Sequence, residues 1–211
     1  MNPLALPRPR GFTLIELLIV ISILGVLAAV LLPELMGASK SAENQATIGS
    51  MLQLETGIKT FERAHGYFPT DDLKSPEAGA NSTWKADNGR NTGIESLVCF
   101  LSQGRDGLDL SGSSDHLTNT DADKHGAQLP LLHRDDRVEY ADAWNTPLAY
   151  FGKFGLDRPQ LMLVDADSEP VTVRAKRRTD GTPIGSGKYQ MLSAGPDRTF
   201  GTDDDLSWPE N

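Results

Sequence analysis

The sequence predicts an α+β fold in which one long N-terminal helix packs on a small antiparallel β-sheet. Three features predict it: an apolar run near the N-terminus, an amphipathic stripe that extends the same helix, and short β-branched and aromatic segments in the second half. The 211 residues suffice for one domain with an appended segment. Because the formal net charge is −9, we expect no nucleic-acid partner.

The apolar run extends from Phe12 to Leu32 and follows a short leader, residues 1–11. At about 1.5 Å per residue, a helix of this length measures about 30 Å, the thickness of the hydrocarbon core of a bilayer. Arg8 and Arg10 precede the run, and positive charge is retained on the cytoplasmic side of a membrane. The sequence therefore predicts one transmembrane helix with the rest of the chain outside the cytoplasm.

Three fates of this segment fit its composition. A secretory signal is cut after the apolar run, where Val26-Leu27-Ala28 is a tolerable site, whereas a signal anchor remains uncut. The third fate turns on Glu16, a carboxylate near the cytoplasmic end of the run. An ionised acid within lipid costs on the order of 3 kcal/mol or more and usually marks function. Glu16 therefore needs a positive partner, which an assembly of subunits provides.

The segment GFTLIE, residues 11–16, resembles the processing site of the type IV pilin family. The resemblance implies that a prepilin peptidase cuts between Gly11 and Phe12 and that the new N-terminal Phe12 is methylated. It also implies that Glu16, the fifth residue of the mature chain, meets the Phe12 amino group of a neighbouring subunit and sets the register of a filament.

Residues 34–64 continue the helix with a polar but helix-compatible sequence. One apolar stripe has helical spacing; its members are Ile48, Met51, Leu54, Ile58 and Phe61. Pro33 removes a backbone hydrogen bond and should kink or loosen the helix. This pattern resembles the spine helix of pilins, in which residues 12–33 form the transmembrane and assembly half, with Glu16 and Pro33 as assembly residues, and residues 34–64 form the amphipathic half.

Residues 65–211 are predicted to form a C-terminal globular domain. Gly66 and Pro69 end the helix, and the segment around them resembles the one that follows the spine in major pseudopilins of type II secretion systems. A glycine-rich insertion, about residues 71–136, contains one apolar helical piece, residues 93–102. The single cysteine, Cys99, lies in that piece and is expected to be a buried small hydrophobic side chain.

The second half of this domain contains the predicted strands. Their β-branched and aromatic content places them at residues 148–151, 161–165, 171–174 and 188–193. The preceding segment, residues 140–150, resembles the "DPWGNPY" segment of the pseudopilins. Ala143 and Thr146 stand where that pattern has proline and glycine, and Trp144 is retained.

The C-terminal loop, residues 193–206, contains four carboxylates and two glycines. Such loops suit Ca²⁺, which takes about six to eight oxygen ligands, although the composition alone favours an acidic solvated tail. The loop resembles the calcium-binding loop of the major pseudopilins, and this implies a structural Ca²⁺. The implied ligands are Asp197, Asp203 and Asp205, with Asp204 and the backbone around Ser193 as further candidates. Arg198 stands where the family often has glycine.

No motif for catalysis is present, so we expect a structural protein and not an enzyme. The resemblance implies a major pseudopilin, the subunit of the periplasmic pseudopilus of a type II secretion system, which supports export of folded proteins across the outer membrane. It implies a homo-oligomeric filament, a prepilin peptidase, an inner-membrane assembly platform and minor pseudopilins as partners, and a single-pass inner-membrane anchor with the globular domain in the periplasm. Two alternatives are a type IV pilin of a surface filament, used in adhesion, motility or DNA uptake, and a secreted calcium-binding module.

Overall fold

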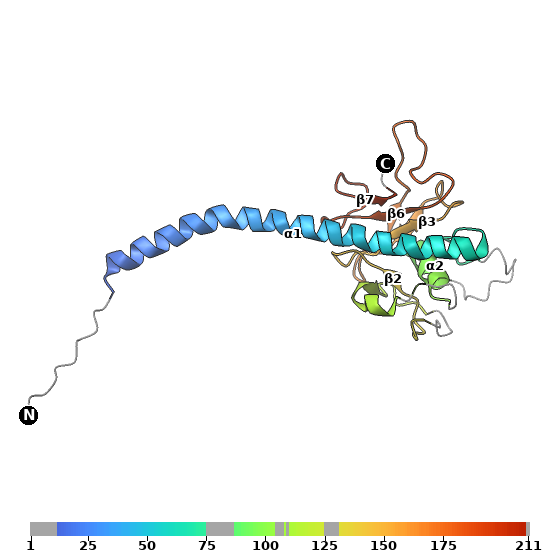
Figure 1. Ribbon diagram of the computed structural model, residues 1–211, viewed down its shortest axis with the longest axis horizontal. Coiled ribbons are helices and arrows are strands. Elements are labelled where there is room, and N and C mark those ends of the chain that lie inside the picture. Colours follow the sequence, from blue (N-terminus) through green and yellow to red (C-terminus); the bar gives the residue numbers. More distant parts are fainter. Residues whose placement is uncertain (1–11, 75–86, 104–107, 109, 125–130, 210–211) are drawn as a thin grey trace, which may run out of the picture. The chain divides into compact units, whose positions relative to one another are not determined.

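The computed structural model describes residues 12–74, 87–103, 108, 110–124 and 131–209. The predicted leader, including Gly11, lies outside the described residues. The chain divides into two compact units, Met1–Ala42 and Glu43–Asn211. Helix α1, Leu14–His65, contributes to both units, and Figure 1 shows it in blue to cyan.

Residues 17–33 of α1, in the first unit, are apolar except for Ser22. Every described side chain from Phe12 to Leu35 is exposed in the single chain, so the covering for this surface must come from outside the chain. Over the described residues, one helix is long and apolar enough to cross a membrane, and it is α1. Pro33 lies inside this helix without ending it.

The end of α1 follows helix-capping rules. Gly66 has a positive φ of 78°, and its N–H donates to the Glu62 carbonyl at 2.7 Å. A left-handed residue directly after a helix is the usual place for glycine, which adopts this conformation without steric cost. The predicted helix end near residue 64 is therefore confirmed at His65.

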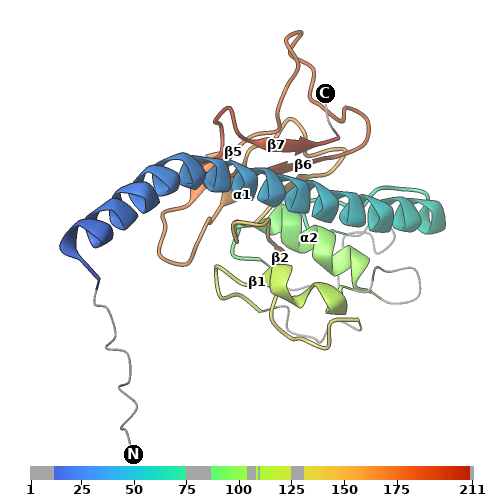
Figure 2. The same ribbon diagram turned by 60° about the vertical axis from the view of Figure 1, so that its left-hand side comes forward.

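The larger hydrophobic cluster of the second unit includes the buried faces of α1 and of α2, Thr92–Leu101, together with residues of the strands. Of the predicted stripe on α1, four members are buried and Ile48 is half-buried; the buried ones are Met51, Leu54, Ile58 and Phe61. Gly57 lets α2 approach closely, because a Cβ at this position would lie 3.1 Å from the Leu101 side chain. Figure 2 shows α2 against the C-terminal part of α1.

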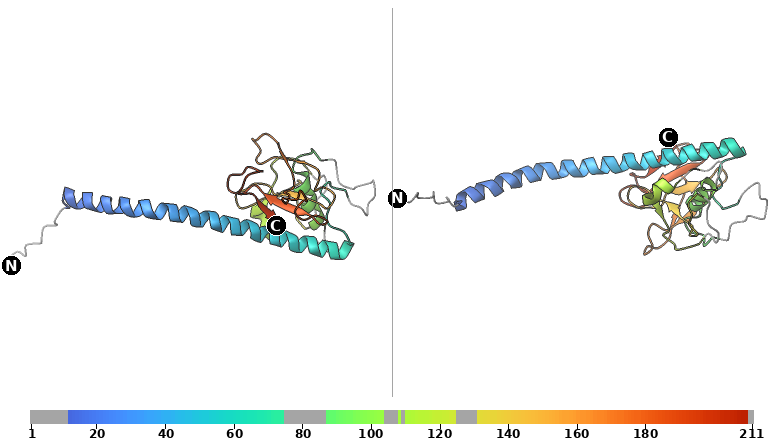
Figure 3. Two further views of the ribbon diagram at one scale, coloured as in Figure 1. Left: turned by 90° about the horizontal axis from the view of Figure 1, so that it is seen from above. Right: turned by 60° about the horizontal axis from the view of Figure 1, so that its bottom comes forward.

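The described residues of the second unit also form seven short strands. They are β1 (Leu117–Thr118), β2 (Glu139–Tyr140), β3 (Ala149–Phe151), β4 (Gln160–Met162), β5 (Val171–Val173), β6 (Gln190–Ser193) and β7 (Leu206–Trp208). The central sheet is antiparallel with the order β3-β6-β7, and in its register Met191 pairs with both Tyr150 and Trp208. Figure 3 shows this sheet beside α1.

The α+β architecture and all four predicted strands are confirmed, with a difference in their arrangement. The strands do not form one sheet, because β1-β2 and β4-β5 are separate two-stranded antiparallel ribbons. The described part of the predicted insertion contains α2, the 3₁₀ helix η1 (Ser111–His116) and β1. Strands β1, β2 and β7 were not predicted from the sequence.

Candidate functional site

The first turn of α1 contains a reciprocal capping arrangement. Thr13 donates from its backbone N–H and its hydroxyl to Glu16 Oε2, at 2.8 and 2.7 Å. In return, the Glu16 N–H donates to Thr13 Oγ1 at 3.3 Å. This is the capping box of a Thr followed three residues later by a Glu. In the single chain Glu16 therefore satisfies an otherwise unpaired backbone donor at the start of an apolar helix.

Phe12, the residue predicted to become the N-terminus, lies at the exposed beginning of the described chain. Phe12 precedes α1 and is 83% exposed. Its predicted cleavage partner, Gly11, lies outside the described residues. Phe12 and Glu16 are thus both exposed at the beginning of the helix.

The segment that resembles the pseudopilin "DPWGNPY" sequence is organised by one buried carboxylate. Asp142 is 1% exposed. Its Oδ1 accepts the N–H groups of Trp144 and Thr146, both at 2.9 Å, and its Oδ2 accepts the Ser193 hydroxyl at 2.6 Å. Ser193 Oγ in turn accepts the Gly195 N–H at 3.1 Å. Asp142 therefore joins the tryptophan turn to the beginning of the C-terminal loop. Burial raises its pKa, against the opposing effect of these hydrogen bonds.

The same turn is attached to α1. Trp144 Nε1 donates to Glu43 Oε2 at 2.9 Å, and the Ala143 N–H donates to Thr47 Oγ1 at 3.2 Å. The retained tryptophan thus has a structural role as an anchor on the helix. Thr47 is fully buried, so this attachment is part of the core of the second unit.

The two main departures from the family pattern contact each other. Arg198 Nε donates to Thr146 Oγ1 at 3.1 Å, so the threonine and the arginine that replace glycines form a hydrogen bond. Arg198 has a positive φ of 56°, the left-handed conformation that glycine adopts most readily. The backbone at residue 198 therefore keeps the conformation that a glycine favours, although the side chain is different.

The C-terminal loop contains one carboxylate oxygen that suits a cation. Asp205 Oδ2 accepts the Gly201 N–H at 2.9 Å, whereas Oδ1 is buried and has no hydrogen-bond partner among the described residues. Burial raises the pKa of Asp205; the Gly201 N–H and the charge of Lys176 oppose this, and the charge of Asp197 adds to it. A buried carboxylate oxygen without a partner is costly unless a proton or a cation satisfies it.

The other predicted ligands are placed less favourably. Asp197 Oδ1 accepts the Thr199 N–H at 2.8 Å, Asp204 Oδ1 accepts the Thr202 hydroxyl at 2.6 Å, and Asp203 is exposed. Within the described part of the chain, the metal-type clusters of three or more acids lie elsewhere. The structure does not bring three of the predicted ligands together, and among them Asp205 Oδ1 is the buried oxygen without a hydrogen-bond partner in the described part of the chain.

The sequence comparisons agree with the architecture. The family model for the prokaryotic N-terminal methylation motif matches residues 6–32. The type II secretion system core protein G of Escherichia coli (strain K12) is 25% identical over 203 residues, which are 96% of this chain and 92% of that protein. The core protein G of Klebsiella pneumoniae is 38% identical over 65 residues, 31% of this chain and 46% of that protein. No solved structure matches the chain.

The exposed apolar helix, the match to the methylation motif over residues 6–32 and the α+β domain together resemble the type IV pilin-like architecture. A similarity that extends over nearly the whole chain is to type II secretion system core protein G. A shorter similarity, 36% identity over 73 residues, relates 35% of the chain to 44% of the type IV major pilin protein PilE of Neisseria gonorrhoeae. The long apolar helix is consistent with membrane anchoring.

Sequence reasoning placed Cys99 correctly and missed two buried acids. Cys99 is 1% exposed and unoxidised, and burial raises its thiol pKa to about 12, which fits a small core side chain. Glu95 and Glu139 are both fully buried. A possible signal was present for Glu95, since it is the one charged residue in the apolar helix TGIESLVCFL.

Proposed function

We propose that this chain is a major pseudopilin, which polymerises into the periplasmic pseudopilus of a type II secretion system and supports export of folded proteins across the outer membrane. The observation that carries the proposal is the nearly full-length similarity to a core protein G, combined with an apolar helix that has no covering in the single chain. Lipid covers this helix before assembly, and other copies of the same helix cover it in a filament.

The proposal includes the position of the chain in the cell. Residues 12–33 anchor it once in the inner membrane, and the globular domain lies in the periplasm. A prepilin peptidase removes residues 1–11 and methylates Phe12. An inner-membrane assembly platform and minor pseudopilins are the further partners. In this role the chain carries out no catalysis itself.

A surface pilus is the second candidate, favoured by the N-terminal match to a gonococcal pilin. That match covers 35% of this chain. Because the chain has a single cysteine, it cannot form the intrachain cysteine pair that many pilins have. The mature filament distinguishes the two candidates: a pseudopilus subunit is required for release of exported proteins, and a surface pilin is required for adhesion, motility or DNA uptake.

Glu16 provides the direct test of assembly. In a filament, its carboxylate would exchange the Thr13 donors for the Phe12 amino group of a neighbouring subunit, which pairs a buried charge. We expect Glu16→Ala to insert into the membrane normally and to yield no filament, whereas Glu34→Ala, which removes another carboxylate from the same helix, retains assembly. Cross-linking and filament yield measure this, and mass spectrometry of the membrane fraction checks for an N-methylated Phe12. Normal filament yield from Glu16→Ala, or a chain that retains Met1, would contradict the proposal.

We also propose a structural Ca²⁺ in the C-terminal loop, held by Asp205 with Asp197, Asp203 and carbonyl oxygens; Asp204 and Ser193 are further candidates. It would stabilise a loop whose acids otherwise repel one another. Replacing Asp203 and Asp205 together by Asn should reduce the rise in thermal midpoint that Ca²⁺ gives the full chain in detergent. A calcium-dependent rise of the same size in parent and variant would exclude this loop as a binding site.

A further inference from the structure

A second group of acids lies far from the C-terminal loop in the sequence, in and directly after the predicted insertion. We call it the acidic cluster; its members are Asp87, Glu95, Asp121, Asp123 and Glu139. The cluster combines two overlapping sets of three carboxylates. Within each set, one oxygen from every residue lies within 4.8 Å of the others, and Glu95 belongs to both sets.

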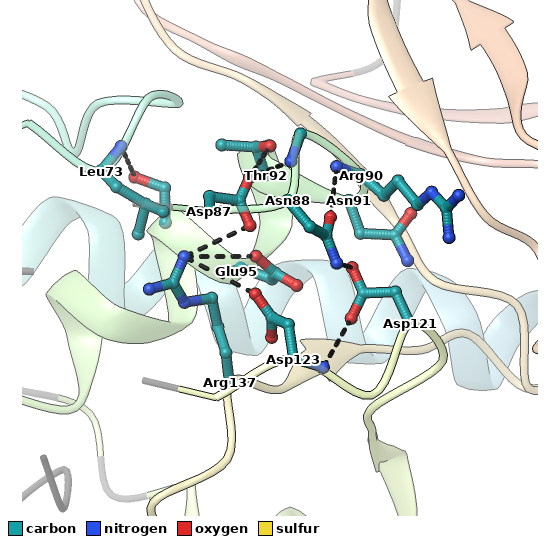
Figure 4. Close-up of polar contacts among 12 residues, drawn as sticks. Leu73, Asp87, Asn88, Arg90, Asn91, Thr92, Glu95, Asp121, Asp123 and Arg137 are labelled. Carbon is teal, nitrogen blue, oxygen red and sulfur yellow. Dashed lines mark hydrogen bonds and ion pairs between the residues drawn. The ribbon is translucent and has the colours of Figure 1, made fainter. Parts of the chain in front are cut away.

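The first set is already partly neutralised. Arg137 Nη1 lies 3.2 Å from Asp87 Oδ1, 3.7 Å from Asp123 Oδ2 and 4.0 Å from Glu95 Oε2. Figure 4 shows the Glu95 carboxylate between those of Asp87 and Asp123, facing Arg137. The Arg137 side chain is fully buried. One guanidinium thus faces three carboxylates, and its positive charge is directed to this side of the cluster.

The buried carboxylate of Glu95 points to a ligand. Its side chain is fully buried, and neither carboxylate oxygen has a hydrogen-bond partner among the described residues. The distance of 4.0 Å to Arg137 is at the outer limit of an ion pair. Burial, together with the charges of the surrounding acids, raises the pKa of Glu95 to about 11. A buried carboxylate of this kind needs a proton or a cation in contact with it.

The second set has its remaining acids held in place by neutral donors. Glu139, fully buried, accepts Asn91 Nδ2 at 2.9 Å and the Thr120 hydroxyl at 2.6 Å on Oε1. Asp121 Oδ2 accepts Asn88 Nδ2 at 2.9 Å. Such outer-shell hydrogen bonds orient carboxylates that bind a metal. Glu139 Oε2 accepts the Thr120 N–H at 3.1 Å, which leaves this oxygen a lone pair for a cation.

We infer that Glu95, Asp121 and Glu139 bind one Ca²⁺, at a site separate from the C-terminal loop. The donor set consists of carboxylate oxygens alone, which suits a hard cation and not a metal that prefers nitrogen or sulfur. Two oxygens bound to the same Ca²⁺ at about 2.3–2.6 Å are at most about 5 Å apart, and the three oxygens of this set meet that limit. The ion would neutralise the Glu95, Asp121 and Glu139 set, as Arg137 partly neutralises the Asp87, Glu95 and Asp123 set.

The test uses the full chain in detergent, freed of metal, with Asp203 and Asp205 both replaced by Asn so that the C-terminal loop does not bind. Equilibrium dialysis should find one Ca²⁺ per chain in this background. Glu95→Gln introduces an uncharged side chain of the same size. Loss of an outer-shell partner lowers metal affinity about 10- to 100-fold, so loss of this direct ligand should lower the calcium affinity by at least that much. The exposed Glu169→Gln is the matched control and should change nothing.

Thermal melting separates a metal ligand from a merely structural acid. With chelator, Glu95→Gln should melt no lower than its background, because it removes an unpaired buried carboxylate; with Ca²⁺ it should melt lower. Asp121→Asn, at a half-buried position, repeats the affinity test if Glu95→Gln does not fold. The inference fails if the background binds no Ca²⁺, if it binds Mg²⁺ in preference, or if Glu95→Gln and Asp121→Asn bind Ca²⁺ as well as the background does. The C-terminal loop is judged separately, by whether the parent binds one Ca²⁺ more than this background.

Discussion

Asp142 is the buried residue whose replacement should destabilise the domain most clearly. It accepts three hydrogen bonds, from the N–H groups of Trp144 and Thr146 and from the Ser193 hydroxyl. A hydrogen bond to a charged group contributes about 1.5–3 kcal/mol, and the contributions of neighbours are not additive. Desolvation of the Asp142 carboxylate, which raises its pKa, offsets part of the total. We therefore expect Asp142→Ala to lower the free energy of unfolding by about 4 kcal/mol.

Two further variants make this estimate specific. Asp142→Asn keeps an acceptor for the two backbone N–H groups and should cost only about 1 kcal/mol. Asp157→Ala removes an ion pair with Arg177 at 2.6 Å, in which Asp157 is 80% exposed, and should cost about 0–1 kcal/mol. Urea unfolding of the full chain in detergent, followed by near-ultraviolet circular dichroism, measures all three. The reasoning is refuted if Asp142→Ala loses no more stability than Asp157→Ala.

Two other predictions concern the contact between α2 and β3 and the pH dependence of stability. Gly93→Ala should lower the free energy of unfolding by about 2 kcal/mol in the same urea assay. Its Cβ would lie 2.2 Å from the Tyr150 carbonyl oxygen, and this overpacking outweighs a gain of about 1 kcal/mol in helix propensity. An unchanged or higher unfolding free energy would contradict this prediction. Burial raises the pKa of Asp71 above its ordinary 3.8, so its native state holds the proton more tightly, and the stability contribution of this residue is lost as the pH rises through 3.8 towards the native pKa. The unfolding free energy of Asp71→Asn, measured against pH, should lack this fall, and parallel profiles of parent and variant would show the sign to be wrong.

The helical half of the fold was predictable because its signals are local. An apolar run of membrane length, a helical stripe and a glycine after the last turn each act within a few residues of the chain. The short strands were found from their composition, but their pairing was not. Pairing depends on contacts between distant segments, such as Met191 with Tyr150 and Trp208, and no local pattern specifies which strands share a sheet.

The chemistry of the buried sites was less accessible for the same reason. Glu139 lies 44 positions after Glu95 in the chain, and the fold brings both into one set of carboxylates. A sequence of scattered acids in a glycine-rich stretch is ordinary for a solvated surface. What distinguishes these two is complete burial, and burial of a charged residue is visible only once the packing of α2 against β2 is known.

The contact between Thr146 and Arg198 shows why a departure from a family pattern is a weak guide to a change of structure. Each stands where the pseudopilin pattern that the segment resembles has glycine. At residue 198 the backbone is left-handed, at a cost of roughly 1 kcal/mol for a side chain other than glycine. Arg198 offsets this cost with hydrogen bonds to Thr146 Oγ1 at 3.1 Å and to the Val164 carbonyl at 3.4 Å. Neither replacement makes this hydrogen bond without the other. The two substitutions therefore act as a pair, and the turn that begins the C-terminal loop is retained by a side-chain contact instead of by the conformational freedom of glycine.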